Sequence, residues 1–323
     1  MGEQLLVVEQ LKKYYSIKRG LFKRDTVVKA VDGVSFTVFK GETFGLVGES
    51  GCGKSTTGRT ILRLDEPTSG RILFNGQDIS GISYSEMRKL RRKMQMVFQD
   101  PYASLNPKKT VKQILMEPLR VHRLYNQKER LEKVIEILRI VGLSEYHLDR
   151  FPHEFSGGQR QRIGIARAVI LQPDLIIADE PVSALDVSIQ SQIINLLLKL
   201  QKDFNLAYVF ISHDLGIVRH ICDRVAVMYL GKIVEMAETE EIFQNAKHPY
   251  TKALISAVPK AHPDEKKERI VLSGDVPSPA NPPKGCPFHP RCPDSLDICK
   301  TVQPPIVNFN NSTVTCHLYA KEG

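Results

Sequence analysis

The sequence predicts an α/β fold with a largely parallel sheet, an inserted helical segment and a C-terminal extension rich in proline and cysteine. Three observations support this prediction. Short apolar runs alternate with helical periodicity over residues 1–247, which is typical of parallel α/β domains. Between residues 99 and 173 only helical periodicity is present. After residue 247 periodicity fades, and 11 of the 19 prolines lie between Pro259 and Pro305.

Seven apolar runs are the expected strands: Leu5–Val8, Ser35–Phe39, Thr43–Val47, Met94–Phe98, Leu175–Ala178, Tyr208–Ile211 and Val225–Tyr229. The inserted helical subdomain, about residues 100–172, contains two expected helices, Gln127–Val141 and Gln159–Leu171. We therefore assign an α/β domain to residues 1–247 and an extension to residues 248–323. We expect the prolines of the extension to prevent it from forming helices or a sheet of its own.

The composition is that of a globular protein. Hydrophobic residues make up 42% of the 323 residues and charged residues 25%, which excludes a wholly disordered, collagenous or coiled-coil chain. No run of 18 apolar residues and no signal sequence is evident, so we expect a chain that stays in the cytoplasm. The net charge of +9 favours an anionic partner or serves solubility alone. The basic stretch Ser16–Thr26 is expected to be a solvated loop.

A phosphate-binding loop follows the third expected strand. It reads Gly48-Glu49-Ser50-Gly51-Cys52-Gly53-Lys54-Ser55-Thr56 and matches G-x4-G-K-[ST] between a strand and a helix. Glycines let consecutive N–H groups point at phosphate oxygens, and the helix that follows adds its positive end. Lys54 supplies a cation for the β- and γ-phosphates, and the Ser55 hydroxyl is a hard oxygen ligand for Mg²⁺. The sequence therefore predicts binding of a nucleotide with magnesium.

Two carboxylates, Asp179 and Glu180, end the apolar run that begins at Leu175. Both should lie at the carboxyl edge of the sheet, where ligands of α/β folds bind. Asp179 is expected to hold Mg²⁺ through water, and Glu180 to polarise the attacking water as the general base. An apolar strand that ends in Asp-Glu is common, but after a phosphate loop it indicates a nucleotide hydrolase.

A second anion-binding turn consists of Ser156, Gly157, Gly158 and Gln159 at the start of an expected helix. In the alternative interpretation these residues form only an ordinary helix cap, because serine is a good N-cap residue. With this turn the sequence resembles the ATP-binding cassette (ABC) ATPases, whose signature reads Ser-Gly-Gly-Gln. The resemblance implies a P-loop NTPase core of the RecA-like type, and a signature turn that closes on ATP bound by another subunit.

The resemblance assigns further roles by position. Gln99 matches the glutamine that senses Mg²⁺ and water, and His213 matches the histidine that contacts the γ-phosphate. Ser183-Ala184-Leu185-Asp186 matches a turn that crosses the dimer interface. Tyr15 matches the aromatic residue that stacks on adenine, although Tyr14 is an alternative.

Other stretches resemble the oligopeptide/dipeptide importer branch. They are Gln99 to Pro107, the basic insertion after Tyr15, His248-Pro249-Tyr250 with the residues that follow, and the proline-rich tail. The resemblance implies an ATP-hydrolysing subunit on the cytoplasmic face of the cell membrane. It pairs with a second, different ABC ATPase and two transmembrane permease subunits, and an extracytoplasmic peptide-binding protein serves the complex. Nickel importers share much of this pattern, so the cargo stays open.

Four of the six cysteines, Cys286, Cys292, Cys299 and Cys316, fall in the last 38 residues. Their spacing lacks the close pairs typical of zinc sites, and a cytoplasmic chain disfavours disulfides. Four thiolates suit a [4Fe–4S] cluster, which similar tails of this branch have been assigned. Zinc and free thiols remain as alternatives.

Two other functions would fit single features of the sequence. A cassette ATPase that acts on DNA or ribosomes would fit the positive charge, but such proteins usually carry two cassettes or long coiled-coil insertions, and this chain has neither. We therefore expect no nucleic-acid partner. A redox sensor built around the tail cysteines would have an activity that follows the oxidation state of the cluster.

Overall fold

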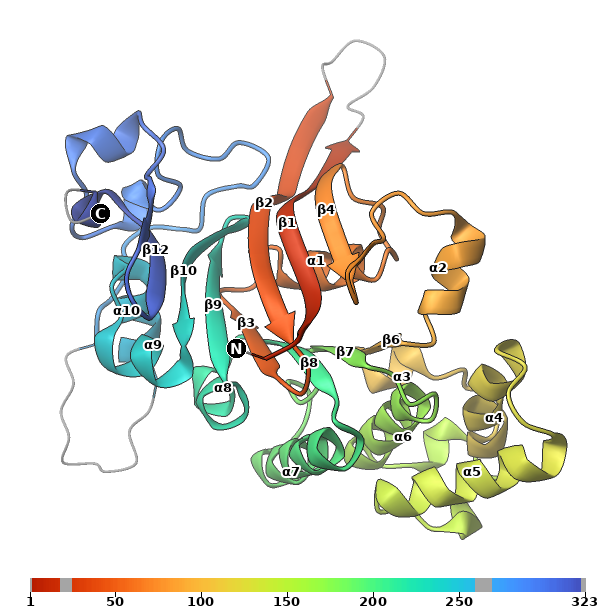
Figure 1. Cartoon of the computed structure of the whole chain (residues 1–323). Helices are drawn as coiled ribbons and strands as arrows, with labels where there is room; N and C mark the ends of the chain where they lie inside the picture. Colours follow the sequence, from red (N-terminus) through yellow and green to blue (C-terminus); the bar gives the residue numbers. More distant parts are fainter. Residues whose placement is uncertain (1, 18–24, 259–268, 321–323) are drawn as a thin grey trace. The chain divides into compact units, whose positions relative to one another are not determined.

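The computed structural model describes residues 2–17, 25–258 and 269–320, so most of the expected basic loop lies outside the described residues. The chain forms two compact units (Figure 1). The first unit consists of Met1–Leu5, Phe39–Glu42 and Gly81–Phe210, and the second of Leu6–Val38, Thr43–Ser80 and Ile211–Gly323.

The first unit contains parallel strands at its centre. β6 (Met94–Val97) pairs in parallel with β7 (Leu175–Asp179), and β8 (Ala207–Ser212) lies on the other side of β7. All five residues of β7 are buried, which explains its continuous apolar sequence. The parallel register aligns Met94 with Leu175 and Val97 with Ala178, so the two strands end at the same edge.

Helices make up the rest of the first unit. They are α2 (Tyr84–Leu90), α3 (Pro101–Ser104), α4 (Val111–Val121), α5 (Gln127–Ile140), α6 (Gly157–Val169) and α7 (Val187–Phe204), with short 3-10 turns at Glu145–His147 and Pro152–Glu154. Among the described residues no strand interrupts the segment between residues 99 and 173, which confirms the helical insertion.

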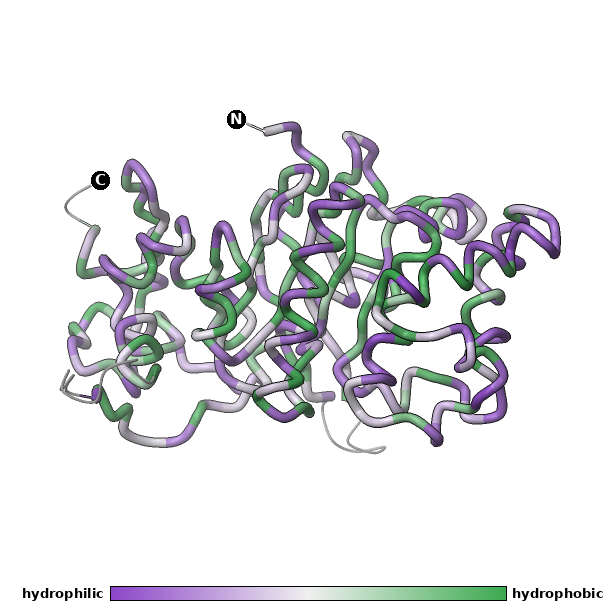
Figure 2. The backbone as a smooth tube through the Cα atoms, turned by 90° about the horizontal axis from the view of Figure 1, so that it is seen from below, coloured by the Kyte–Doolittle hydropathy of each residue, from purple (hydrophilic) through white to green (hydrophobic). Residues whose placement is uncertain are grey.

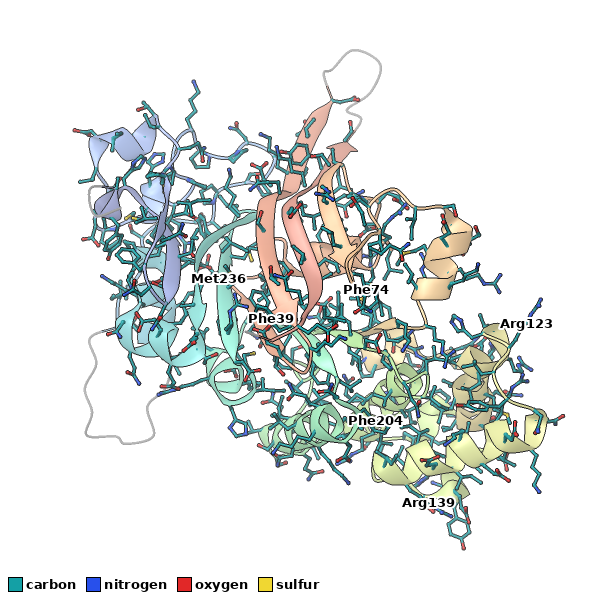
Figure 3. The ribbon with its side chains drawn as sticks, in the orientation of Figure 1. Phe39, Phe74, Arg123, Arg139, Phe204 and Met236 are labelled. Carbon is teal, nitrogen blue, oxygen red and sulfur yellow. The ribbon has the colours of Figure 1, made fainter. Side chains whose placement is uncertain are left out.

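The helices of the insertion begin at polar caps and bury one face. Thr110 and Asn126 cap α4 and α5 with capping boxes, which satisfy backbone N–H groups of the first turn. Val134 and Leu138 of α5 are buried, whereas Arg139 lies at the outer surface (Figure 3). The helical turns in Figure 2 alternate between hydrophobic and hydrophilic residues in the same way.

The second unit contains a four-stranded sheet in the order β2–β1–β4–β5, formed by β1 (Gln4–Ile17), β2 (Thr26–Phe39), β4 (Ser69–Phe74) and β5 (Gln77–Asp78). β1 and β2 are much longer than the runs Leu5–Val8 and Ser35–Phe39 predicted from the sequence. The missed parts mix polar and half-buried residues with isolated buried ones, Leu11, Val31 and Val34, so no continuous buried run marks them.

Five further strands of this unit are hydrogen-bonded to one another in the order β11–β12–β10–β9–β3. β3 (Thr43–Val47) and β9 (Arg224–Tyr229) are parallel, and β10 (Lys232–Glu238) pairs with β9 in the antiparallel direction. This unit also contains the helices α1 (Lys54–Ile61), α8 (Leu215–Ile221), α9 (Thr239–Asn245) and α10 (Pro249–Ser256).

The expectation that the extension builds no helix or sheet of its own is wrong. β11 (Ile306–Asn308) and β12 (Ser312–Thr315) form an antiparallel hairpin, and β12 pairs with β10. Both strands come from stretches without proline, and Val307, Val314 and Cys316 form a small buried core against Phe309 and Tyr319. The extension also contains the helix α10, and its other described elements are 3-10 turns at His289–Arg291, Asp297–Lys300 and His317–Tyr319.

A buried polar pair fixes the start of α10. The Glu235 carboxylate on β10 accepts the N–H groups of Lys247 (2.7 Å) and His248 (2.9 Å). His248 is the N-cap of α10, and its Nδ1 accepts the N–H of Tyr250 at 3.1 Å. The ring is 1% exposed, and this burial lowers the pKa of His248 from 6.5 to about 3.

The buried histidine predicts a pH dependence of stability. Below pH 6.5 the unfolded chain binds a proton at His248, whereas the folded chain does so only near pH 3. The free energy of unfolding should therefore fall as the pH drops through this window, by up to about 1.4 kcal/mol per pH unit from this group. Urea titrations of the wild type and of His248→Asn between about pH 6.5 and pH 3 measure this change in the free energy of unfolding.

Asparagine keeps an N-cap acceptor but does not titrate, so His248→Asn should show the shallower slope. Burial raises the pKa of Glu235, which therefore also contributes to the pH dependence. Because both proteins contain Glu235, the comparison cancels most of that contribution. Parallel slopes for the two proteins would contradict the prediction.

Candidate nucleotide-binding site

The phosphate loop of the second unit lies between β3 and α1, as the motif predicts. β3 is buried along its whole length, and Lys54 is the first residue of α1. Gly48 has φ +152°, and a Cβ atom there would lie 2.2 Å from the carbonyl oxygen of Met228. Gly53 has φ +106°, and a Cβ atom there would lie 2.1 Å from the carbonyl oxygen of Ala30. Both positions therefore require glycine.

Lys54 is held by its own loop. Its Nζ donates to the carbonyl oxygens of Gly48 (2.8 Å) and Glu49 (3.0 Å), and the residue is 4% exposed. The Cys52 side chain is buried beside it, and desolvation raises the pKa of the Cys52 thiol. Ser55 and Thr56 follow Lys54 in the first turn of α1. The loop thus places an ammonium group and two hydroxyls beside a helix N-terminus, where phosphate oxygens are stabilised.

Tyr14 and Tyr15, the two candidates for adenine stacking, differ in their surroundings. The Tyr14 hydroxyl donates to the Asp32 carboxylate, and burial raises the pKa of Tyr14 to about 12. Tyr15 is 37% exposed, and its hydroxyl donates to Asp65 at 3.2 Å. Tyr15 also interacts with the hydroxyl of Thr56 in the phosphate loop. The structure therefore brings Tyr15, but not Tyr14, to the loop.

In the first unit two predicted catalytic side chains meet. Asp179 ends β7 and is 6% exposed, and Glu180 follows it with φ +45°. The Nε2 of Gln99, which follows β6, donates to Oε2 of Glu180 at 2.9 Å. The parallel register of β6 and β7 produces this contact, because it ends both strands at one edge. A carboxylate that accepts from an amide at this edge can accept a proton from a water molecule.

The Ser-Gly-Gly-Gln turn is also a helix cap. The Ser156 hydroxyl accepts the Gln159 N–H (3.4 Å), and Oε1 of Gln159 accepts the Ser156 N–H (3.1 Å). A Cβ atom at Gly158 would lie 2.5 Å from Cγ2 of Ile189 on α7, so this glycine also allows close packing. Asp186, the N-cap of α7, is exposed.

The predicted residues fall into two groups. Gln99, Ser156–Gln159, Asp179, Glu180 and Asp186 belong to the first unit, and Tyr15, Gly48–Thr56 and His213 to the second. His213 is exposed and lies between β8 and α8. The hard oxygen atoms of Ser55, Asp179 and Gln99 suit Mg²⁺ chemically.

The four tail cysteines influence one another. Burial raises the pKa of Cys292 and Cys316 to about 11, and neighbouring tail thiols add to the shift. Burial also raises the pKa of Cys286, whose N–H donates to the Cys299 carbonyl oxygen at 2.8 Å. No three His, Cys, Asp or Glu side chains in the described parts of the chain are arranged to hold a metal ion. As placed, the thiols do not form a cluster site.

Sequence reasoning missed two side chains that contact the phosphate loop. Arg291 donates to the Glu49 carboxylate at 2.7 and 3.1 Å, and the Tyr250 hydroxyl accepts the Glu49 N–H at 2.9 Å. Tyr250 lies in the stretch that begins at His248 and Arg291 in the proline-rich tail, but nothing in their local sequence indicates which loop they contact.

Comparisons with known proteins decide the family. The oligopeptide transport ATP-binding protein AppF of Bacillus subtilis (strain 168) is 59% identical over 323 residues, a match that spans 98% of each chain. The chain belongs to the ABC transporter family. The family model for the ABC transporter matches residues 31–183 of this ABC protein, and that for the oligopeptide/dipeptide transporter, C-terminal region, matches residues 234–299.

Other proteins of the ABC family are also similar to this chain. The dipeptide transport ATP-binding protein DppF of Escherichia coli (strain K12) is 50% identical over 316 residues, covering 98% of this chain and 95% of DppF. The dimeric structure of the bacterial ABC transporter cassette MJ0796 has 28% identity and a TM-score of 0.66, and covers 73% of this chain and 99% of that cassette. The predicted P-loop α/β fold is thereby confirmed.

The glycines of the ABC phosphate loop predict unequal effects of alanine. Gly53→Ala adds a left-handed strain and a clash with Ala30, and should lower the free energy of unfolding by about 3 kcal/mol. Gly51→Ala is the matched control, because its Cβ atom meets nothing within 4 Å although φ is +78°. It should cost only about 1 kcal/mol of strain. Urea unfolding measures both, and equal losses would contradict the packing argument.

Proposed function

We propose that this chain is the ATP-hydrolysing subunit of a membrane complex that imports dipeptides or oligopeptides, a translocase in which hydrolysis of ATP to ADP and phosphate drives transport. The observation that carries the proposal is the glycine-dependent loop that holds Lys54, in a chain 59% identical to an oligopeptide transport ATP-binding protein. The Gln99–Glu180 contact supports the hydrolytic part of the proposal.

Each site residue has a proposed role. Backbone N–H groups of the loop and Lys54 bind the β- and γ-phosphates, while Tyr15 stacks on adenine. Ser55, Asp179 and Gln99 hold Mg²⁺, which neutralises charge on the phosphates when bound. Glu180 accepts a proton from the attacking water, with Gln99 orienting its carboxylate.

His213 contacts the γ-phosphate of the same site. The remaining roles require a second cassette, because Ser156–Gln159 and Asp186 act on the nucleotide of the partner across the dimer interface. We propose that the partner is a different ABC ATPase, so that the complex contains a heterodimer. The cassette is assigned to residues 1–247 and the extension to residues 248–323.

The proposed complex places this chain at the cytoplasmic face of the membrane. None of the helices in the described ranges has both the length and the apolarity to cross a bilayer. Two permease subunits would supply the membrane path, and an extracytoplasmic peptide-binding protein would deliver the cargo. No nucleic-acid partner is proposed.

We also propose that Cys286, Cys292, Cys299 and Cys316 bind a [4Fe–4S] cluster after a local rearrangement. Three of the four are at most 8% exposed, and their thiols lie within electrostatic range of one another. A cluster of this type takes four thiolates.

The base assignment predicts a separation of binding from turnover. Glu180→Gln should bind MgATP as the wild type does but lower steady-state hydrolysis by at least about 100-fold, because an amide cannot accept the proton of the water. Glu136→Gln, which alters an exposed glutamate paired with Lys133 on α5, is the matched control. Turnover and peptide uptake are measured in the assembled complex, and near-normal turnover of Glu180→Gln would remove Glu180 from this role.

The cluster proposal predicts metal content. Protein purified without oxygen should be brown and contain about four irons per chain. Cys292→Ser should lose iron and colour, whereas Cys222→Ser, which changes a buried cysteine outside the tail, should keep both. Colourless protein with stoichiometric zinc, or with no metal, would overturn the proposal and leave the ATPase assignment untouched.

A further inference from the structure

Glu49, the second residue of the phosphate loop, is bound by two residues from the C-terminal part of the chain. The Arg291 guanidinium donates from Nη1 to Oε2 of Glu49 at 2.7 Å and from Nη2 to Oε1 at 3.1 Å. The N–H of Glu49 donates to the Tyr250 hydroxyl at 2.9 Å. The side chain and the backbone of Glu49 are thus fixed separately, within the second unit.

Both partners of Glu49 rest on a buried aromatic cluster formed by Tyr229, Tyr250 and Phe288. The ring centroids of Tyr229 and Tyr250 are 4.8 Å apart, and Phe288 packs edge-on against Tyr229 at 5.2 Å. Arg291 is 9% exposed and its guanidinium lies 6.0 Å from the Tyr229 ring. Arg291 and Tyr250 therefore reach Glu49 from a rigid base, and the two-pronged ion pair of Arg291 restricts orientation as well as distance.

The contact leads directly to the phosphate-binding lysine. The carbonyl oxygen of Glu49 accepts from Nζ of Lys54 at 3.0 Å, and that of Gly48 accepts at 2.8 Å. A shift of the Glu49 backbone would move an acceptor that positions the ammonium group. The N–H groups of the same loop face phosphate oxygens in loops of this type, so their direction depends on the same backbone.

We propose that Arg291 and Tyr250 are positioning residues for nucleotide binding: they hold the Glu49 backbone, and through it Lys54, in the arrangement that binds the β- and γ-phosphates. The inference rests on the proposed function, since it assumes that the loop binds MgATP. It assigns the C-terminal part of the chain a role at the nucleotide site besides any metal that its cysteines bind.

The alternative is that these contacts only fasten the extension to the rest of the unit. Tyr319 provides the control for this alternative. Its hydroxyl donates to the carbonyl oxygen of Lys247 at 3.0 Å, so it also fastens the extension, but this bond does not involve the phosphate loop. Tyr319→Phe and Tyr250→Phe each delete one hydroxyl and keep the ring.

The experiment measures MgATP and MgADP dissociation constants and thermal stability for the full chain. Tyr250→Phe and Arg291→Ala should each weaken binding of both nucleotides, by about tenfold for Arg291→Ala, since bonds to charged groups are the stronger ones. Arg291→Lys keeps the positive charge but loses the two-pronged guanidinium, so its nucleotide affinity should lie between those of Arg291→Ala and the wild type. Tyr319→Phe should bind both nucleotides as the wild type does, whatever its stability.

Two results would overturn the inference alone: wild-type nucleotide affinity in Tyr250→Phe and Arg291→Ala, or an equal loss of affinity in Tyr319→Phe. Lys300→Ala, which breaks an exposed ion pair with Asp297 in the same extension, checks that loss of a tail charge has no effect by itself. If the wild-type chain itself fails to bind MgATP, the proposed function is overturned and this inference with it.

Discussion

At two glycines the backbone of the phosphate loop passes so close to neighbouring strands that no side chain fits. At Gly53 it approaches the carbonyl oxygen of Ala30 on β2, and at Gly48 that of Met228 on β9. These close approaches tie β2, β9, β3 and α1 into one packed arrangement within the second unit. The carbonyl groups that hold Lys54 take their directions from it, so the chemistry of the loop depends on a steric constraint at two glycines.

Features with a local signal were predictable from the sequence. The phosphate loop, the buried strand before Asp179 and the helix after Ser156 each depend on neighbouring residues: glycines, a continuous apolar run and a capping serine. Parallel pairing of two such strands then accounts for the Gln99–Glu180 contact. The residues on which the catalytic proposal depends can therefore be predicted from short segments of the sequence.

Features that depend on distant pairing were not predictable. The missed parts of β1 and β2 contain only isolated buried residues, and the hairpin β11–β12 is stable because it joins β10 and buries Val314. Proline content suggested a tail without helices or a sheet of its own, but composition averages over short stretches that lack proline. Likewise, nothing near Arg291 in the sequence indicates that its partner is Glu49.

The ion pair between Glu49 and Arg291 joins residues 242 positions apart, and β12 adds to a strand that lies within the cassette range. The extension is consequently not an interchangeable module. A chimera that takes its cassette from one relative and its tail from another must match at positions 49 and 291, or it buries a guanidinium without its carboxylate. Exchange of the extension between relatives is therefore constrained, and residues 49 and 291 are expected to change together.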